Sequence, residues 1–140
     1  MSRPRAAAPD IERLTVPILD QAMADVGETV TVGVGVPEGW TPDVTPHLEV
    51  AWDGTPVVFA QGVVYGATLR IVARAKTTTT AKRLASLAQG LLTAHSGGGG
   101  ITSFRPLTGP LPARDPDTRA ELCSVTLRAT ARAVTVPESS

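Results

Sequence analysis

The sequence predicts an α+β fold, in which two helices pack on one face of a mostly antiparallel sheet in a single domain. Two segments space their apolar residues three and four apart, as helices do, and several others alternate apolar and polar residues, as strands do. The order is helix, strands, helix, strands, without the regular alternation that builds a parallel sheet. A chain of 140 residues fits one domain, which we place at 10–136 between flexible tails at 1–9 and 137–140.

Composition narrows the classes of function. The 13 basic and 13 acidic residues give a net charge of zero, which argues against nucleic acid or an anionic membrane as the main partner. Aromatic residues are only 4% of the chain, so the core must use smaller side chains, and oligomerisation would bury more apolar surface. No apolar run approaches the length of a membrane span. The single cysteine, Cys123, cannot form an intrachain disulfide and is expected to be a buried thiol.

The first predicted helix begins after a cap at Asp10 and ends near Asp25. Its apolar residues form one stripe at helical spacing: Ile11, Leu14, Ile18, Leu19, Ala22, Met23 and Val26. Pro17 lies inside this pattern and has no backbone N–H, so the helix is expected to kink or restart there.

Strands are predicted after this helix. Thr29–Val36 alternates valine with threonine or glycine, which indicates a strand. Its glycine face suggests either close packing by another element or a bend in the strand. Residues 37–46 contain three prolines and form a loop, in which Trp40 is a candidate interface residue. The alternation of Leu48, Val50 and Trp52 predicts the next strand.

Residues 57–75 predict one long strand or a hairpin, broken near Gln61-Gly62 or at Gly66. The second helix is then predicted from about Thr79 to Ala94, with a threonine as its N-cap. Its apolar side contains Ala81, Leu84, Leu87, Ala88, Leu91 and Leu92.

The run Gly97–Gly100 is expected to end the second helix as a flexible connector. A phosphate-binding loop is the alternative, but that motif needs Lys and then Ser or Thr after the glycines, at the start of a helix. Here Ile101-Thr102 follows and a helix ends, so we favour the connector.

The C-terminal part predicts two strands separated by a loop. Ile101–Leu107 is a short strand, and residues 108–119 are expected to be irregular because they contain three prolines. The alternating run Leu122–Val136 predicts the last strand. Its core side has Cys123, Val125, Leu127, Ala129, Ala131 and Ala133.

Possible catalytic or metal-binding residues are few. His47 and His95 lack further ligands at the spacing of a zinc site, so both are interpreted as structural. Asp115 and Asp117 could form an acid/base pair or bind a divalent ion. Because Arg114 and Arg119 flank them, we favour a salt-bridged or solvated loop. No cofactor is expected.

Four arginines occupy alternate positions on the polar sides of two predicted strands: Arg70, Arg74, Arg128 and Arg132. If these strands are neighbours, that face of the sheet is basic. The alternatives are a solvated face and a surface that meets another subunit, an acidic partner or passing DNA. Together with Arg114, Asp115, Asp117 and Trp40, these arginines are the candidate interface or lumen residues.

A longer series of motifs carries a family resemblance. It comprises Ile11, Leu14 and Leu19 in the first helix, Pro46-His47-Leu48-Glu49-Val50, the strand entering Ala75, Ala81-Lys82-Arg83-Leu84-Ala85, Ile101-Thr102-Ser103-Phe104, the loop from Gly109-Pro110 to Asp115-Pro116-Asp117, and the strand Leu122–Val134. In this order, and over about residues 10–136, the chain resembles the tail terminator (tail completion) proteins of long-tailed bacteriophages.

The resemblance implies a small structural protein without enzymatic activity that forms a hexameric ring at the head–tail junction of the virion. The ring would cap the tail tube and join it to the head after assembly in the host cytoplasm. The implied partners are copies of the same chain, the tail tube protein and a head-closure or connector protein, with DNA passing through the lumen and no membrane contact. The alternatives are another neck component, such as a head-closure or connector protein, and a small ligand-binding or enzymatic α+β domain.

Overall fold

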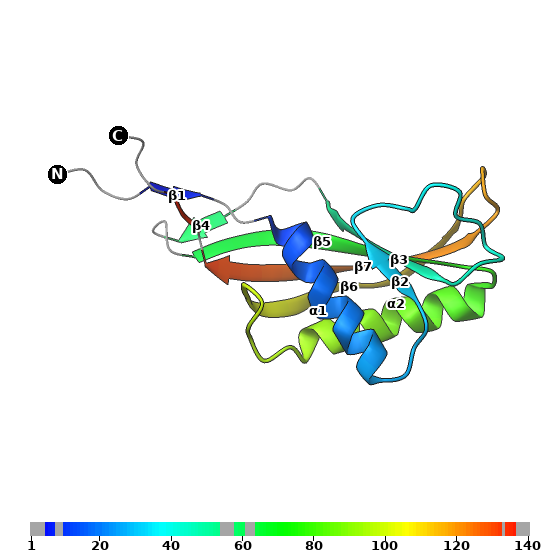
Figure 1. The fold of residues 1–140 in the computed structure, drawn as a ribbon, viewed down its shortest axis with the longest axis horizontal. Helices are drawn as coiled ribbons and strands as arrows, with labels where there is room; N and C mark the ends of the chain where they lie inside the picture. Colours follow the sequence, from blue (N-terminus) through cyan, green and yellow to red (C-terminus); the bar gives the residue numbers. More distant parts are fainter. Residues whose placement is uncertain (1–4, 8–9, 54–57, 61–63, 133, 137–140) are drawn as a thin grey trace.

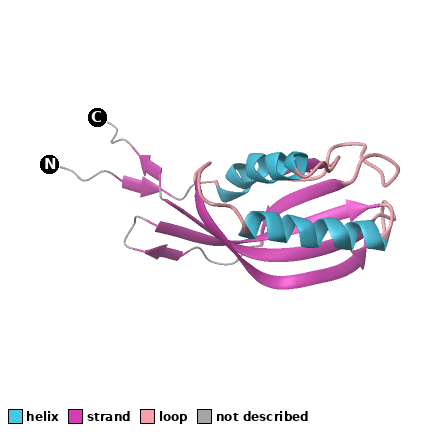
Figure 2. Ribbon diagram, turned by 90° about the horizontal axis from the view of Figure 1, so that it is seen from below, coloured by secondary structure: helices cyan, strands magenta, loops and turns pink. Residues whose placement is uncertain are grey.

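The computed structural model describes residues 5–7, 10–53, 58–60, 64–132 and 134–136. These residues form two layers, a sheet and two helices that lie on one of its faces (Figure 2). The structure therefore confirms the predicted α+β fold, with a mostly antiparallel sheet and both helices on one side. At one end the strands extend beyond the helices (Figure 1).

The main sheet has the order β2-β3-β5-β7-β6, and β4 pairs with the beginning of β5. Its strands are β2 (Thr31–Gly33), β3 (His47–Trp52), β4 (Val58–Ala60), β5 (Val64–Ala75), β6 (Ile101–Arg114) and β7 (Glu121–Arg132). All neighbours are antiparallel except β2 and β3, which run parallel. Of the two alternatives for 57–75, a long strand or a hairpin, the structure has the hairpin, β4 and β5; the expected break at Gln61-Gly62 lies outside the described residues, and Gly66 lies within β5.

Helix α1 (Ile11–Asp25) confirms the first predicted helix. Asp10 caps it, because the Asp10 carboxylate accepts a hydrogen bond from the Arg13 backbone N–H at 3.2 Å. The helix continues through Pro17 without restarting, which corrects one of the two outcomes expected there. Proline removes a single backbone donor, and here its ring lies on the exposed side of the helix.

Helix α2 (Thr78–Thr93) confirms the second predicted helix to within one residue at each end. Thr77 is its cap and accepts from the Thr80 N–H at 3.2 Å. The side that packs on the sheet is fully buried and consists of Ala81, Leu84, Ala85, Ala88 and Leu92. Among the described residues, no helix is long and apolar enough to cross a membrane.

The core lies between α2, α1 and the central strands β5 and β7. The register pairs Leu69 with Leu127 and Ile71 with Val125, and all four side chains are 0% exposed. Cys123 is also buried, as predicted, and burial raises the pKa of its thiol. Alternation therefore places one face of β5 and β7 against the helices and leaves the other face uncovered by them.

The glycine run 97–100 is a packed turn, which corrects the expectation of a flexible connector. All four residues have positive φ, between 63° and 101°, a region in which other residues are strained. A Cβ built on Gly99 would lie 3.2 Å from Ile18, and one on Gly100 would lie 3.0 Å from Leu14. The turn therefore needs glycine both for its backbone angles and for its close approach to α1.

The edge strand β6 corrects the prediction that 108–119 is irregular. It continues to Arg114, with register shifts where the regular pairing is interrupted. Because β6 pairs with β7 on one side only, Pro106, Pro110 and Pro112 need not supply N–H groups to a second neighbour. Prolines that would break a central strand are compatible with this edge.

At the opposite edge β2 is shorter than predicted. Only Thr31–Gly33 pairs with β3, and Val34 and Val36 are 42% and 39% exposed. The expected close packing on the glycine face is found at Gly33, where an added Cβ would contact the His47 ring at 3.6 Å. Residues 37–46 form a loop, as predicted.

The two ends of the described chain pair with each other. β1 (Arg5–Ala7) and β8 (Val134–Val136) form a separate antiparallel sheet at the end where the strands extend beyond the helices (Figure 1). This pairing corrects the prediction of a flexible tail for Arg5–Ala7, since β8 accepts and donates its backbone hydrogen bonds. The predicted tail at 137–140 and the predicted core residue Ala133 lie outside the described residues.

Candidate functional site

The face of the sheet opposite the helices carries several arginines, three of which lie close together on neighbouring strands. Pairing of β5 with β7 places Arg70 opposite Thr126, and pairing of β6 with β7 places Arg105 directly opposite Arg128. Directly opposed side chains on one face have Cβ atoms about 5 Å apart, and diagonal neighbours such as Arg70 and Arg128 about 7–8 Å. We call Arg70, Arg105 and Arg128 the arginine cluster.

The arginine cluster has uncompensated positive charge. Within the described part of the chain, none of its three guanidinium groups forms an ion pair. Like charges directly opposite each other on a sheet destabilise it, so Arg105 and Arg128 gain if an anionic group binds between them. The predicted basic face is therefore present, and a partner's carboxylates or phosphates would complete it.

Gly66 positions one member of this cluster. A Cβ on Gly66 would lie 3.0 Å from Arg128 Nη2 and 3.1 Å from Nε, so the guanidinium lies across β5 where glycine leaves room. Arg128 is half-buried, whereas Arg70 and Arg105 are exposed. The predicted interface residue Arg132 is also exposed on this face, opposite Val64 on β5.

Arg74 lies on the same face but has a different role. Its Nη2 binds Glu49 of β3 at 3.1 Å, and its Nη1 binds Asp115 beyond β6 at 3.0 Å. The side chain is only 15% exposed, and its Nε is buried without a hydrogen-bond partner. Arg74 therefore links two strands and a turn, and its charge is already neutralised.

The turn between β6 and β7 contains the predicted acidic pair. Asp115 Oδ1 accepts from the Asp117 backbone N–H at 2.9 Å, and this hydrogen bond, aided by Arg74, lowers the pKa of Asp115 below its usual value. Arg114 forms an ion pair with Glu121 at 2.7 Å. Asp115 and Arg114 thus fit the salt-bridged interpretation. Among the described residues, no group of three or more His, Cys, Asp or Glu is placed to hold a metal ion.

Trp40 is buried in the loop that follows β2. Its indole is 8% exposed, and Nε1–H donates to the Thr45 carbonyl at 2.8 Å. The candidate interface role for Trp40 is therefore corrected to a structural one, because the ring stabilises the loop from inside.

His47 fastens the same loop to the sheet. Its ring is 1% exposed, with Nε2 at 2.5 Å from the Gly35 carbonyl and Nδ1 at 2.7 Å from the Thr31 hydroxyl. A carbonyl only accepts, so Nε2 carries the proton and Nδ1 accepts from Thr31. This arrangement confirms the structural interpretation of His47.

The stability of the fold is expected to depend on His47 protonation. Burial lowers the pKa of His47 below 6.5, so the unfolded chain binds the proton more tightly than the folded chain. The contribution of neutral His47 to the free energy of unfolding should be fully present above pH 6.5. It should decrease as the pH falls from 6.5 toward the lowered pKa of the folded protein. Chemical denaturation between about pH 5 and pH 7.5 measures this slope.

The matched variant for this measurement is His47→Gln, which keeps a polar side chain but does not titrate. The free energy of unfolding of His47→Gln should be lower than that of the unchanged protein at every pH, but it should vary less over the same pH range. Asp115 does not contribute to the pH dependence in this range, because its pKa in the folded protein is lowered below 3.8. Parallel pH dependence in the two proteins would show that His47 is not the titrating group.

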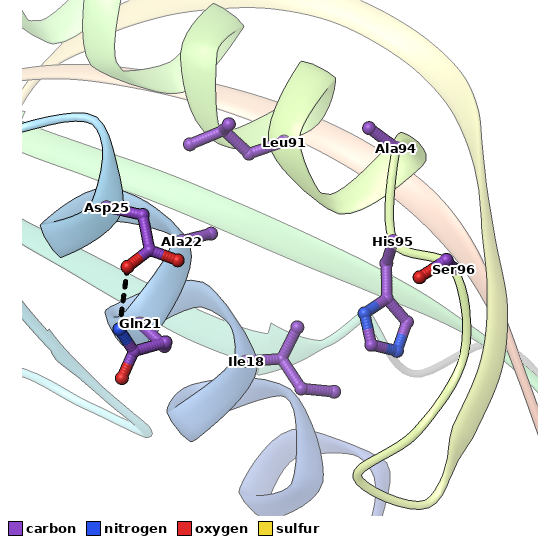
Figure 3. A pocket seen from close by; sticks show the side chains of 8 residues that line it. All are labelled: Ile18, Gln21, Ala22, Asp25, Leu91, Ala94, His95 and Ser96. Carbon is purple, nitrogen blue, oxygen red and sulfur yellow. Dashed lines mark hydrogen bonds between the residues drawn. The ribbon is translucent and has the colours of Figure 1, made fainter.

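A groove of about 300 Å³ lies between the two helices, on the side opposite the arginine cluster. Figure 3 shows Gln21 and Asp25 of α1 on one side of it and His95 and Ser96 at the other. His95 Nε2–H points to the Gly98 and Ile101 carbonyls, at 3.0 and 3.2 Å, and its ring packs edge-on against Phe104. His95 thus holds the glycine turn, as its structural interpretation predicts.

Arg105 was not among the residues predicted from the sequence. Its position could have been inferred from Phe104, because a buried aromatic on a strand directs the next residue to the opposite face. The pairing of Arg105 with Arg128 could not, since it depends on the register between β6 and β7.

Comparison with known proteins assigns no family to the chain. No protein-family model matches it, and no curated protein sequence matches it significantly.

Proposed function

We propose that this protein is a non-enzymatic virion component of the tail terminator type, which forms a ring at the head–tail junction of a long-tailed phage. The proposal starts from the order of motifs that resembles this family. The observation that carries it furthest is the arginine cluster on the helix-free face of the sheet. A solvated sheet face does not need three arginines without acidic partners, whereas a face that meets a neighbour uses them.

The edges of the sheet favour a closed assembly over continuous strand pairing. β6 is a long edge strand, and unprotected edges recruit other strands. Pro106 and Pro112 lack the N–H groups that another strand would need. Subunits of this shape would therefore contact one another through faces, which is compatible with a ring of fixed size.

The partners that follow are copies of the same chain, the tail tube protein and a head-closure or connector protein. DNA would pass through the lumen without base-specific contacts, and the protein would reside in the virion after assembly in the host cytoplasm. A different neck component is compatible with the same surfaces. The helix-side groove favours a ligand-binding domain as a second candidate, because its volume reaches the lower range of small-molecule sites.

Negative-stain imaging tests the proposal. Purified full-length protein, alone or mixed with terminator-free tail tubes of the phage that encodes it, should form six-fold rings and should cap one end of each tube. Rings that bind isolated connectors and ignore tubes would indicate another neck component. A protein that remains monomeric at all concentrations and leaves tubes uncapped would contradict the proposal.

A further inference from the structure

We infer that copies of this chain associate head to tail, with the arginine cluster of one copy docked on the α1 side of the next, where Asp20 is exposed and Asp25 lies at the margin of the helix groove. This inference rests on the proposed function and assigns the two surfaces that would close the ring. It follows from the distribution of unpaired charge over the two faces of the molecule.

The helix layer presents unpaired carboxylates. Asp20 and Asp25 are exposed on α1, and neither forms an ion pair with another described residue. The arginines of the helix layer form ion pairs with other carboxylates, Arg13 with Asp10 and Arg83 with Glu28. The exposed Lys82 lies near the start of α2, whereas the groove lies at its last turns.

The groove beside Asp25 has the chemistry to receive arginine side chains. Its apolar part is formed by Ile18, Ala22, Leu91 and Ala94, and Asp25 stands at its margin (Figure 3). Asp25 Oδ1 accepts from Gln21 Nε2 at 2.8 Å, which orients the carboxylate. An arginine packs its aliphatic stem on an apolar surface and binds a carboxylate through two N–H groups.

The two charged surfaces cannot meet within one molecule, because the helices cover one face of the sheet and the arginine cluster lies on the other. A second copy supplies the matching surface. Contacts between two different faces of identical subunits are heterologous, and they close into a ring when successive rotations add to a full turn. The zero net charge of the chain fits this pairing better than it fits a nucleic acid partner.

Charge reversal tests the pairing. The sheet-face variant is Arg70→Glu with Arg128→Glu, and the helix-face variant is Asp20→Arg with Asp25→Arg. Each variant should raise the dissociation constant for self-association at least tenfold, because like charges then face each other at the interface. Sedimentation over a concentration series measures this constant. The two variants mixed in equal amounts, and the chain carrying all four changes, should recover association, since opposite charges again face each other.

The matched control is Lys76→Glu with Lys82→Glu, which reverses two exposed charges outside both surfaces and should associate as the unchanged protein does. Thermal unfolding of each variant checks that the fold is intact. If the unchanged protein and both variants associate equally, the docking surfaces are wrong and the ring proposal stands. If the unchanged protein never associates, with or without tail tubes, the proposed function fails and this inference with it.

Binding of duplex DNA to the same variants distinguishes a nucleic acid partner of the arginine cluster from a second copy of the chain. Loss of DNA binding by the sheet-face variant, with unchanged self-association, would assign the arginine cluster to nucleic acid and overturn the inference. Loss of self-association that is recovered by mixing the variants supports docking between copies.

Discussion

Replacing Leu127 with alanine is expected to lower the free energy of unfolding by about 2–5 kcal/mol. Leu127 is on the central strand β7, is 0% exposed, and pairs with Leu69 on β5. It belongs to the same core cluster as the buried side of α2, so truncation leaves a cavity where the sheet meets the helix. Urea denaturation followed by circular dichroism measures the loss.

The control for Leu127→Ala is Arg70→Ala, an exposed substitution on the other face of the same sheet. Its effect should be within about 0.5 kcal/mol of zero. Equal unfolding curves for Leu127→Ala and the unchanged protein would contradict the assignment of the core to this face.

Replacing Gly100 with alanine is expected to lower the free energy of unfolding by about 1–3 kcal/mol. Gly100 has φ of 88°, where a Cβ strains the backbone, and that Cβ would lie 3.0 Å from Leu14 Cδ1 on α1. The substitution therefore adds a steric conflict to the backbone strain and displaces α1 from the turn. Thermal and urea unfolding both report the change.

Gly98→Ala separates the two contributions to the Gly100 effect. Gly98 has φ of 101° but no atom within 4 Å of an added Cβ, so it retains the strain and lacks the contact. Gly98→Ala should therefore be less destabilising than Gly100→Ala. Equal losses in the two variants would contradict a contribution from the contact with Leu14.

Gly90 lies in the interior of α2 and has open space where a Cβ would be added. Gly90→Ala should therefore raise the free energy of unfolding by about 0.5–1 kcal/mol, which urea unfolding measures.

Both helices and the buried side of β7 could be predicted from the sequence, because residues within each segment determine them. Asp10 and Thr77 cap helices whose apolar stripes recur at 3.6 residues per turn, and the alternation from Cys123 to Ala131 marks one face of a strand. Neighbouring elements reinforce these local preferences in the folded chain.

The extent of β6 could not be predicted in the same way. Prolines at 106, 110 and 112 indicate a loop when only local preference is considered. Their compatibility with a strand depends on β6 lying at the edge of the sheet, and this position is set by the pairing order of strands far apart in the sequence. The overestimated length of β2 has a similar cause, since alternation continues after its pairing with β3 has ended.

The candidate surface could be predicted only in part. The alternate spacing of Arg70, Arg74 and Arg128 indicated a basic face, and the register of β5 with β7 brings them onto one. Which charges stay unpaired depends on contacts across long sequence distances. Asp115 neutralises Arg74, whereas Arg105 joins Arg128 and increases the local charge.

The pairing of β1 with β8 has a practical consequence for engineering. Arg5 and Val136 are register partners on adjacent antiparallel strands, about 5 Å apart. Affinity tags or fluorescent reporters joined to β1 or to β8 would thus leave these strands at the same end of the sheet, beyond the helices. A short linker from β8 to β1 would make a circular permutant whose joined strands are already neighbours.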